Sequence, residues 1–249
     1  MSRCRAAERV TLRLVPSHTT PDPTRADTAT DTTAAAFVFD MDGVLVDSER
    51  PFLRTLHTLL TEAGVAHDRD GLRHLCGQPA PALRAFLLER FGGDETAAAA
   101  FGERYQAAKR RFLENGEIQV MPGAHDVLAT LRERGTALAV ATSTYRDAAL
   151  ERLARYDLAR WFDDVVTGDQ VVKGKPAPDI FLLAAERLRV DPRACIAVED
   201  SAAGVQAASD AGMTVFAVAH TFQPGELGQA HRVFRDMFDL DGHLRERAG

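Results

Sequence analysis

Acidic side chains follow two short apolar runs of this chain, at the point where each run ends. Asp40 and Asp42 come after one run, and Glu199 and Asp200 come after another. Side chains on an extended chain repeat every two residues, so Asp40 and Asp42 project to the same side. Four carboxylates gathered in one place would repel one another strongly without a cation. Hard oxygen ligands of this kind suit Mg²⁺, which takes one or two carboxylates, waters and a substrate phosphate.

A phosphate group could be bound beside these acids. Thr142 and Ser143 follow a third apolar run, and Lys175 lies in a Gly-Lys-Pro turn just before a predicted helix. An acidic pocket cannot by itself accept a phosphate dianion. Mg²⁺, the Lys175 ammonium and the Thr142 hydroxyl together reverse the negative electrostatic field of the acids. They supply positive charge and hydrogen-bond donors for the oxygens of a transferring phosphoryl group. Lysine suits this role because its charge is compact.

Each of these signals is weak by itself. An isolated Asp-x-Asp is usually a solvated loop, and a lysine in a Gly-Lys-Pro turn is normally a surface charge. Thr142 could be a capping residue, and Glu199 with Asp200 could simply favour the N-terminus of a helix that starts near Ser201. The prediction of a site rests on their occurrence at equivalent ends of successive apolar runs.

The elements that must position these residues alternate between strands and helices. After residue 120, short apolar runs alternate with helical patterns at 125–135, 147–157, 178–190 and 201–212. This alternation predicts a parallel sheet with helical crossovers, whose ligands bind beyond the carboxyl ends of the strands.

The segment 49–120 differs from the rest of the chain, because all of its apolar patterns have helical spacing. Helices are expected over 48–64, 68–77, 80–93 and 94–116. We therefore expect an α/β fold with an open, Rossmann-like core over 36–48 and 121–249 and a helical insert after its first strand.

Length and composition set further limits. With 249 residues, 45% of them hydrophobic, the chain can bury a sizeable core, and disorder of the whole chain is excluded. The net charge of −6, with acids interleaved among the arginines, argues against a nucleic-acid partner. No stretch approaches the roughly 20 apolar residues of a membrane helix, and the start does not resemble a secretory signal. We expect a cytoplasmic protein with a flexible extension over 1–35; the sequence does not indicate an oligomeric state.

Other conspicuous residues are expected to be structural. Cys76 and Cys195 lie in apolar patterns typical of buried thiols. The histidines show no paired spacing that would indicate a zinc site. Phe101 and Tyr105, at helical spacing, are expected to pack in a core. Lys109 and the arginines around it would ordinarily form a solvated helix face, although one of them could reach a substrate.

Four segments together resemble, in order and spacing, the motifs of the haloacid dehalogenase superfamily of phosphotransferases. They are DMDGVLVDSE (40–49), AVATS (139–143), GKPAPDIF (174–181) and VEDSAAGVQAA (198–208). They are most similar to the branch of sugar-phosphate phosphatases and β-phosphoglucomutase-like enzymes. The resemblance implies a phosphoric monoester hydrolase that acts on a small phosphorylated molecule.

The resemblance also implies a role for each motif residue. Asp40 would be the nucleophile that becomes an aspartyl phosphate. Asp42 would be the general acid that protonates the leaving oxygen and then the base that activates water. Thr142 and the backbone N–H of Ser143 would bind the phosphoryl oxygens, and Lys175 would neutralise them and hold Asp40 in place.

Mg²⁺ is the cofactor that the resemblance implies. It would be bound by the Asp40 carboxylate, the Asp42 backbone carbonyl and Asp200, with Glu199 a ligand directly or through water. The acid at position 42 also argues against a dehalogenase, because hydrolytic dehalogenases of the superfamily lack it and need no magnesium.

The helical insert would be a cap that closes over the site, excludes water and contacts the leaving group. It departs from β-phosphoglucomutases in two places. Those enzymes carry a cap histidine where this chain has Phe52, and they carry an arginine shortly after a cap glycine, where this chain has the segment 77–80 without an arginine. A mutase must shield its phosphoenzyme from water. Hydrolysis, with a sugar phosphate as the expected substrate, is therefore preferred, and a phosphomutase is the alternative. A signalling receiver that is phosphorylated without turnover is a third interpretation, but receivers have no such cap.

Overall fold

The computed structural model describes residues 34–247 except 69–70, 76–79, 116–117 and 221. The extension expected over 1–35 falls almost wholly outside these residues, as do Cys76 and most of the segment 77–80.

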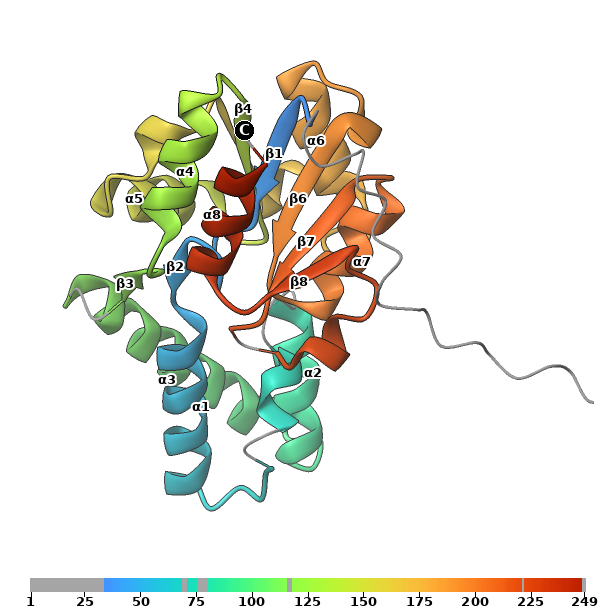
Figure 1. Cartoon of the computed structure of the whole chain (residues 1–249). Helices are drawn as coiled ribbons and strands as arrows, with labels where there is room; N and C mark the ends of the chain where they lie inside the picture. The colour runs from blue at the N-terminus through green and yellow to red at the C-terminus, as the bar shows by residue number, and fades with distance from the viewer. Residues whose placement is uncertain (1–33, 69–70, 76–79, 116–117, 221, 248–249) are drawn as a thin grey trace, which may run out of the picture.

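A six-stranded sheet, all of it parallel, forms the centre of the molecule (Figure 1). Its strands run in the order β5-β4-β1-β6-β7-β8. Their bounds are Ala36–Phe39 for β1, Ala137–Thr142 for β4, Asp164–Thr167 for β5, Cys195–Glu199 for β6, Thr214–Val218 for β7 and Arg232–Phe234 for β8. The α/β fold expected from the sequence is confirmed.

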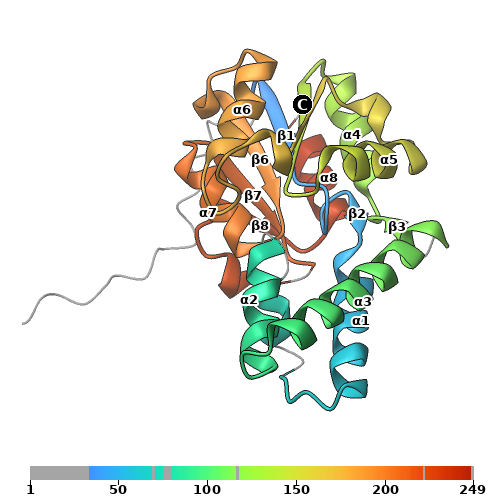
Figure 2. The ribbon, with the colours of Figure 1, turned by 180° about the vertical axis from the view of Figure 1, so that it is seen from behind.

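Both faces of the sheet are covered by helices (Figures 1 and 2). The helices are α4 (Ala124–Glu133), α5 (Arg146–Arg155), α6 (Asp179–Leu188), α7 (Ala202–Asp210) and α8 (Met237–Glu246). Phe37 and Phe39 of β1 belong to an apolar cluster with α4, α5 and α8, whereas Ala36 and Val38 pack with α6 and α7. A strand buried on both faces reads as a continuous apolar run, which is why AFVF was recognisable in the sequence.

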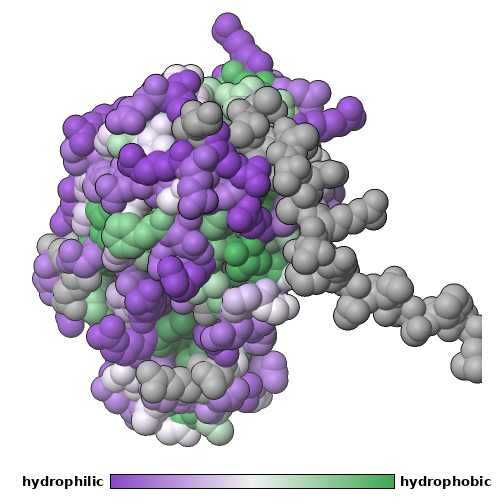
Figure 3. Space-filling model, viewed as in Figure 1, coloured by the Kyte–Doolittle hydropathy of each residue, from purple (hydrophilic) through white to green (hydrophobic). Residues whose placement is uncertain are grey.

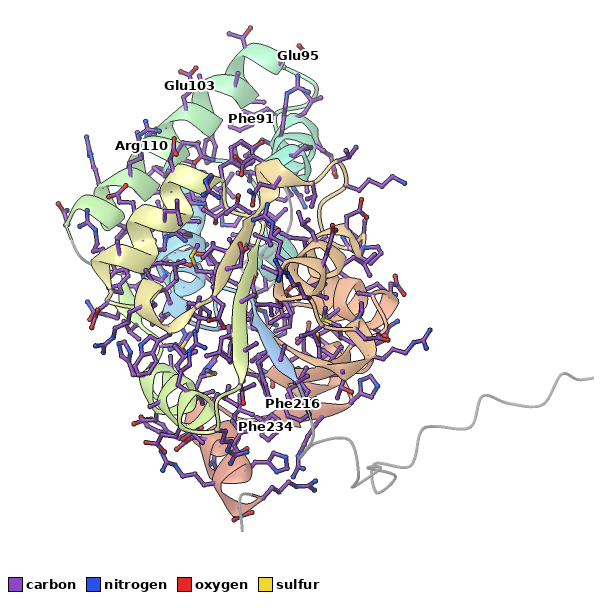
Figure 4. The ribbon with its side chains drawn as sticks, turned by 90° about the horizontal axis from the view of Figure 1, so that it is seen from above. Phe91, Glu95, Glu103, Arg110, Phe216 and Phe234 are labelled. Atoms are coloured by element: carbon purple, nitrogen blue, oxygen red, sulfur yellow. The ribbon has the colours of Figure 1, made fainter. Side chains whose placement is uncertain are left out.

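The end of the chain belongs to the predicted core, but no strand or helix was predicted there. β8 adds a sixth strand beside β7, and α8 packs on α4. Phe234 of β8 lies against Phe216 of β7, with ring centroids 5.2 Å apart (Figure 4). The run that forms β8 is only three residues long and begins with the exposed Arg232, so it lacks the continuous apolar pattern of the central strands.

The segment between β2 (Val46–Asp47) and β3 (Gln119–Val120) is helical, as expected. It contains α1 (Glu49–Glu62), the 3₁₀ helix η1 (Gly71–Leu75), α2 (Ala80–Arg90) and α3 (Glu95–Glu114), where an ordinary helix had been predicted in place of η1. These helices lie together beyond one end of the sheet (Figures 1 and 2). β2 and β3 pair antiparallel, with Val46 opposite Val120, so the two connections run side by side.

The helical segment has its own buried contacts. Phe101 and Tyr105 of α3 are 5% and 6% exposed, which confirms that they pack in a core. Phe101 contacts Phe91, with ring centroids 5.5 Å apart. The opposite side of α3 is exposed and carries Glu95 and Glu103 (Figure 4).

The surface is predominantly polar on the face shown in Figure 3, with smaller apolar areas between the charged side chains. None of the described helices is long and apolar enough to cross a membrane.

Cys195 is a buried free thiol at the start of β6, as expected. Burial, together with the smaller effect of the nearby Asp191 carboxylate, raises the pKa of this thiol to about 11. We expect iodoacetamide at pH 8 to leave Cys195 unmodified in the folded protein, because the thiolate is the reactive form. Peptide mass mapping before and after denaturation in guanidinium checks this. Alkylation of the folded protein at the rate of a free cysteine would contradict it.

Candidate active site

Most of the predicted site residues lie at the ends of three neighbouring strands. β4, β1 and β6 are adjacent and parallel, so their carboxyl ends meet at one edge of the sheet. Asp40 directly follows β1, and its backbone N–H donates to the Val198 carbonyl of β6 at 2.9 Å. Thr142 ends β4 and Glu199 ends β6. The parallel topology brings together residues that lie far apart in the sequence.

Lys175 contacts the ends of all three strands. Its side chain is 2% exposed, and its Nζ donates to Asp40 Oδ1 at 2.5 Å, to Glu199 Oε1 at 2.5 Å and to the Ala141 carbonyl at 3.0 Å. An ammonium has three N–H groups, so these contacts use all of its donors. Burial lowers the pKa of Lys175, but the charges of Asp40 and Glu199 raise it by more, and the net shift is upward. The lysine therefore stays charged in the folded protein.

The pKa of the Asp40 carboxyl lies well above its ordinary value. Burial raises its pKa, and the carboxylates of Glu199 and Asp42 raise it further, which outweighs the lowering by Lys175. One lysine thus does not balance the negative charge gathered here. An added cation would stabilise the ionised form of Asp40.

A divalent cation fits the acidic side of this pocket. Asp40, Glu199 and Asp200 are all buried, and each offers a carboxylate oxygen within 4.8 Å of the other two. Hard oxygen donors of this kind suit Mg²⁺. Gly43, with φ of +88°, lets the loop after β1 pass so close to Asp200 that a Cβ would overlap its carboxylate. The Asp42 side chain is not part of this three-acid group.

Glu199 is held by hydrogen bonds to both of its carboxylate oxygens. Its Oε1 accepts from Lys175, and its Oε2 accepts from the backbone N–H groups of Asp200 and Ser201 and from the Ser201 hydroxyl. A Cβ at Gly204, in the first turn of α7, would overlap this carboxylate. Glu199 therefore links Lys175 to the N-terminus of α7 in addition to lying near the possible metal position. Ser201 also caps α7, since its hydroxyl accepts from the Gly204 N–H at 3.1 Å.

The Asp42 carboxylate is held by three donors. Ser48 Oγ and Arg152 Nη1 donate to its Oδ1, and Thr144 Oγ1 donates to its Oδ2 at 2.8 Å. Burial raises the pKa of Asp42, but the Arg152 charge and the hydrogen bonds from Ser48 and Thr144 lower it by more, so the pKa lies below its ordinary value.

Neither Thr144 nor Arg152 was identified from the sequence. Thr144 lies two residues beyond Thr142, a spacing that could have indicated a shared orientation. Arg152 interrupts the buried stripe of α5 between Ala149 and Leu153, and a charge at such a position was an available signal. The contact that Ser48 makes was not expected either. Ser48 precedes α1 at the N-cap position, but its hydroxyl donates to Asp42 and makes no capping hydrogen bond.

Thr142 and Ser143, which are predicted to bind a phosphate, lie at the end of β4 and in the loop that follows it. Thr142 is 1% exposed at the end of β4, and its Oγ1 accepts from the Thr144 N–H at 3.1 Å. Ser143 is half-buried in the loop that follows. A Cβ at Gly168 would overlap the Ser143 carbonyl, so the loops after β4 and β5 are in close contact.

Lys109 of α3 differs from its expected solvated position. It is half-buried, and its Nζ lies 4.1 Å from the ring centroid of Phe52 and 5.6 Å from that of Tyr105. Burial has the largest effect on the pKa of Asp42 and raises it. Arg152, Ser48 and Thr144 lower this pKa, and the charge of Lys109 lowers it by a smaller amount. Its neighbour Arg110 is exposed, as expected (Figure 4).

Comparison with known proteins adds independent observations. The family described as haloacid dehalogenase-like hydrolase matches residues 34–212. A phosphorylated carbohydrates phosphatase of Thermotoga maritima is 36% identical over 192 residues, which are 77% of this chain and 88% of that protein. The fructose-1-phosphate phosphatase YqaB of Escherichia coli is 33% identical over 179 residues, which are 72% of this chain and 93% of that protein. The crystal structure of CbbY from Rhodobacter sphaeroides with xylulose-(1,5)bisphosphate superimposes with a TM-score of 0.65 at 26% identity, over 82% of this chain and 95% of that one.

Proposed function

Because this chain belongs to the haloacid dehalogenase-like hydrolase family, we propose that it is a magnesium-dependent phosphatase of a small sugar phosphate. The proposal includes an aspartyl-phosphate intermediate on Asp40. The observation that carries it is the buried Asp40 carboxylate, bonded to Lys175 at 2.5 Å and grouped with Glu199 and Asp200. This arrangement offers a nucleophile, a fixed positive charge and oxygen ligands for a cation at one strand edge.

In the first step, a carboxylate oxygen of Asp40 attacks phosphorus. A bond from this oxygen to phosphorus forms while the bond from phosphorus to the sugar oxygen breaks. Lys175 holds the carboxylate through its Oδ1 and supplies positive charge for the phosphoryl oxygens. Thr142 and Ser143, at the end of β4, supply donors to these oxygens. A bound Mg²⁺ supplies the charge that allows a phosphate dianion to approach several carboxylates.

Asp42 moves the protons. As a carboxylic acid it donates a proton to the leaving sugar oxygen, and as a carboxylate it then accepts a proton from the water that attacks the aspartyl phosphate. Water attack releases inorganic phosphate and restores Asp40. The ionised state that Arg152 favours is the one that this second step requires.

The helical segment 49–120 is proposed to be the cap domain, with the core over 36–48 and 121–249. α1 and α3 place Phe52 and Lys109 toward the Asp42 side of the site. The paired connections β2 and β3 join this segment to the core at one place, so small changes there would move the helices as a unit.

The substrate class is supported by the relatives. The Thermotoga protein is named for phosphorylated carbohydrates and the Escherichia coli protein for fructose 1-phosphate. A phosphomutase is the alternative, since β-phosphoglucomutases share the fold. Phe52 favours hydrolysis, because this 5% exposed aromatic ring occupies the position at which those mutases carry a cap histidine.

A panel of substrates tests the proposal. We expect phosphate release from sugar phosphates to exceed release from nucleoside monophosphates and phosphoglycolate, and EDTA to suppress it until Mg²⁺ is restored. Inorganic phosphate is the measured product. Isomerisation of glucose 1-phosphate, primed with a bisphosphate, at a higher rate than phosphate release would favour the mutase. A stable phosphoprotein without turnover would favour the receiver.

A further inference from the structure

Arg152 is a charged residue on the buried side of α5. It is 5% exposed and lies in the same stripe as Ala149 and Leu153, both fully buried. Removing a guanidinium from water costs several kcal/mol, and that cost is offset only by well-formed charged hydrogen bonds. A surface helix that carries an arginine at this position therefore needs a specific partner for it.

The partner is the Asp42 carboxylate. Arg152 Nη1 donates to Asp42 Oδ1, and the two side chains form an ion pair that is 6% and 18% exposed. The Nε of Arg152 is buried and has no hydrogen-bond partner in the described part of the chain. The guanidinium thus donates a charged hydrogen bond to Asp42 while its own Nε has no partner among the described residues.

The other two donors to Asp42 are neutral hydroxyl groups. Ser48 lies at the start of α1, and Thr144 lies in the loop after β4. A charged hydrogen bond is roughly twice as strong as a neutral one, and a guanidinium is more rigid than a rotating hydroxyl. Arg152 therefore contributes most to the orientation of this carboxylate.

We propose that Arg152 is a positioning residue for proton transfer, which holds the Asp42 carboxyl group in the orientation that reaches the leaving oxygen and the attacking water. The inference rests on the proposed phosphatase function. It assigns no contact between Arg152 and the substrate, because its described partner is Asp42.

Two substrates with different leaving groups distinguish this positioning role from a purely structural one. A sugar alkoxide is a poor leaving group and needs the proton from Asp42 as its bond to phosphorus breaks. A p-nitrophenolate ion leaves without a proton. Because kcat/KM reports the steps through formation of the aspartyl phosphate, loss of positioning lowers kcat/KM for the sugar phosphate more than for p-nitrophenyl phosphate.

The experiment compares Arg152→Gln and Arg152→Lys with Arg155→Gln in the full chain, at saturating Mg²⁺. Arg155 is a matched control, because it lies on the same helix and pairs with Glu151 at 3.0 Å on the surface. For Arg152→Gln we expect kcat/KM to fall about 100-fold with the best sugar phosphate of the panel and less than about 10-fold with p-nitrophenyl phosphate. Arg152→Lys recovers part of the loss, and Arg155→Gln behaves as the unmodified chain.

A double variant tests whether Arg152 acts through Asp42. In the Asp42→Asn background, Arg152→Gln is expected to cause no further loss for either substrate. Equal losses for both substrates, or an additional loss in that background, would overturn the positioning role. Should Arg152→Gln not fold, the same comparison is made with Arg152→Lys. If the unmodified chain releases phosphate from neither substrate, the proposed function is overturned, and this inference with it.

Discussion

Asp40→Asn is expected to abolish phosphate release, with kcat lowered by about 10⁴-fold or more. The amide has nearly the shape of the carboxylate and still offers an oxygen to Lys175, but it cannot attack phosphorus. Loss of the nucleophile removes the covalent route entirely, so residual turnover comes only from direct attack by water. Steady-state release of phosphate from the best sugar phosphate measures the effect, and mass spectrometry of the quenched enzyme shows whether the phosphoenzyme is lost.

Folding of this variant is expected to be preserved. Burial and two neighbouring acids raise the pKa of Asp40, so a neutral side chain at this position relieves repulsion with Glu199 and Asp42. The thermal unfolding midpoint should therefore not fall by more than a few degrees. Asp210→Asn is the matched control, because Asp210 is an exposed residue at the end of α7 that accepts from Gln206 at 2.7 Å. Full turnover by Asp40→Asn would refute the aspartyl-phosphate mechanism.

Lys175→Met is expected to lower both stability and activity. It leaves the carboxylates of Asp40 and Glu199 buried and facing each other without their shared cation. Removing one partner of a buried ion pair typically destabilises a protein by about 3–5 kcal/mol. For a chain of this size that corresponds to a fall of the unfolding midpoint on the order of 10 °C.

The activity of Lys175→Met should also fall, by about 10²–10³-fold in kcat, because the positive charge beside the phosphoryl oxygens and the contact that holds Asp40 are both lost. Calorimetry and phosphate release measure the two effects separately. Lys173→Met provides a close control, since it makes the same change two residues earlier at an exposed position of the same loop. An unchanged unfolding midpoint for Lys175→Met would show that Asp40 and Glu199 do not depend on this lysine.

The parts of the site that follow buried strands were predictable from the sequence. Asp40 and Glu199 come directly after continuous apolar runs, and parallel pairing of β1 with β6 then places their backbones side by side. Lys175 was predictable as part of a motif, and the resemblance implied its contact with Asp40, but its contacts with Glu199 and the Ala141 carbonyl were not predicted. Which atoms it reaches depends on how the loop before α6 folds back over the sheet, and no local pattern encodes this.

The contacts around Asp42 were missed for the same physical reason. Arg152 comes from α5 and Ser48 from the start of α1, so their meeting at one carboxylate is a property of tertiary packing. Helical periodicity predicts the helix over 147–157, but an arginine within its apolar stripe does not indicate by itself which carboxylate it contacts. Lys109 was misplaced likewise, because its contact with Phe52 joins α3 to α1.

The pairing of β2 with β3 also bears on how such a protein can be altered. Val46 and Val120 are opposite each other, so the chain leaves for α1 and returns from α3 at neighbouring points. The order of the six parallel strands is continuous without any contribution from the intervening helices. A helical segment of another length or composition could therefore be grafted between these two points, exchanging the proposed cap while Asp40, Thr142 and Glu199 stay at the ends of their own strands.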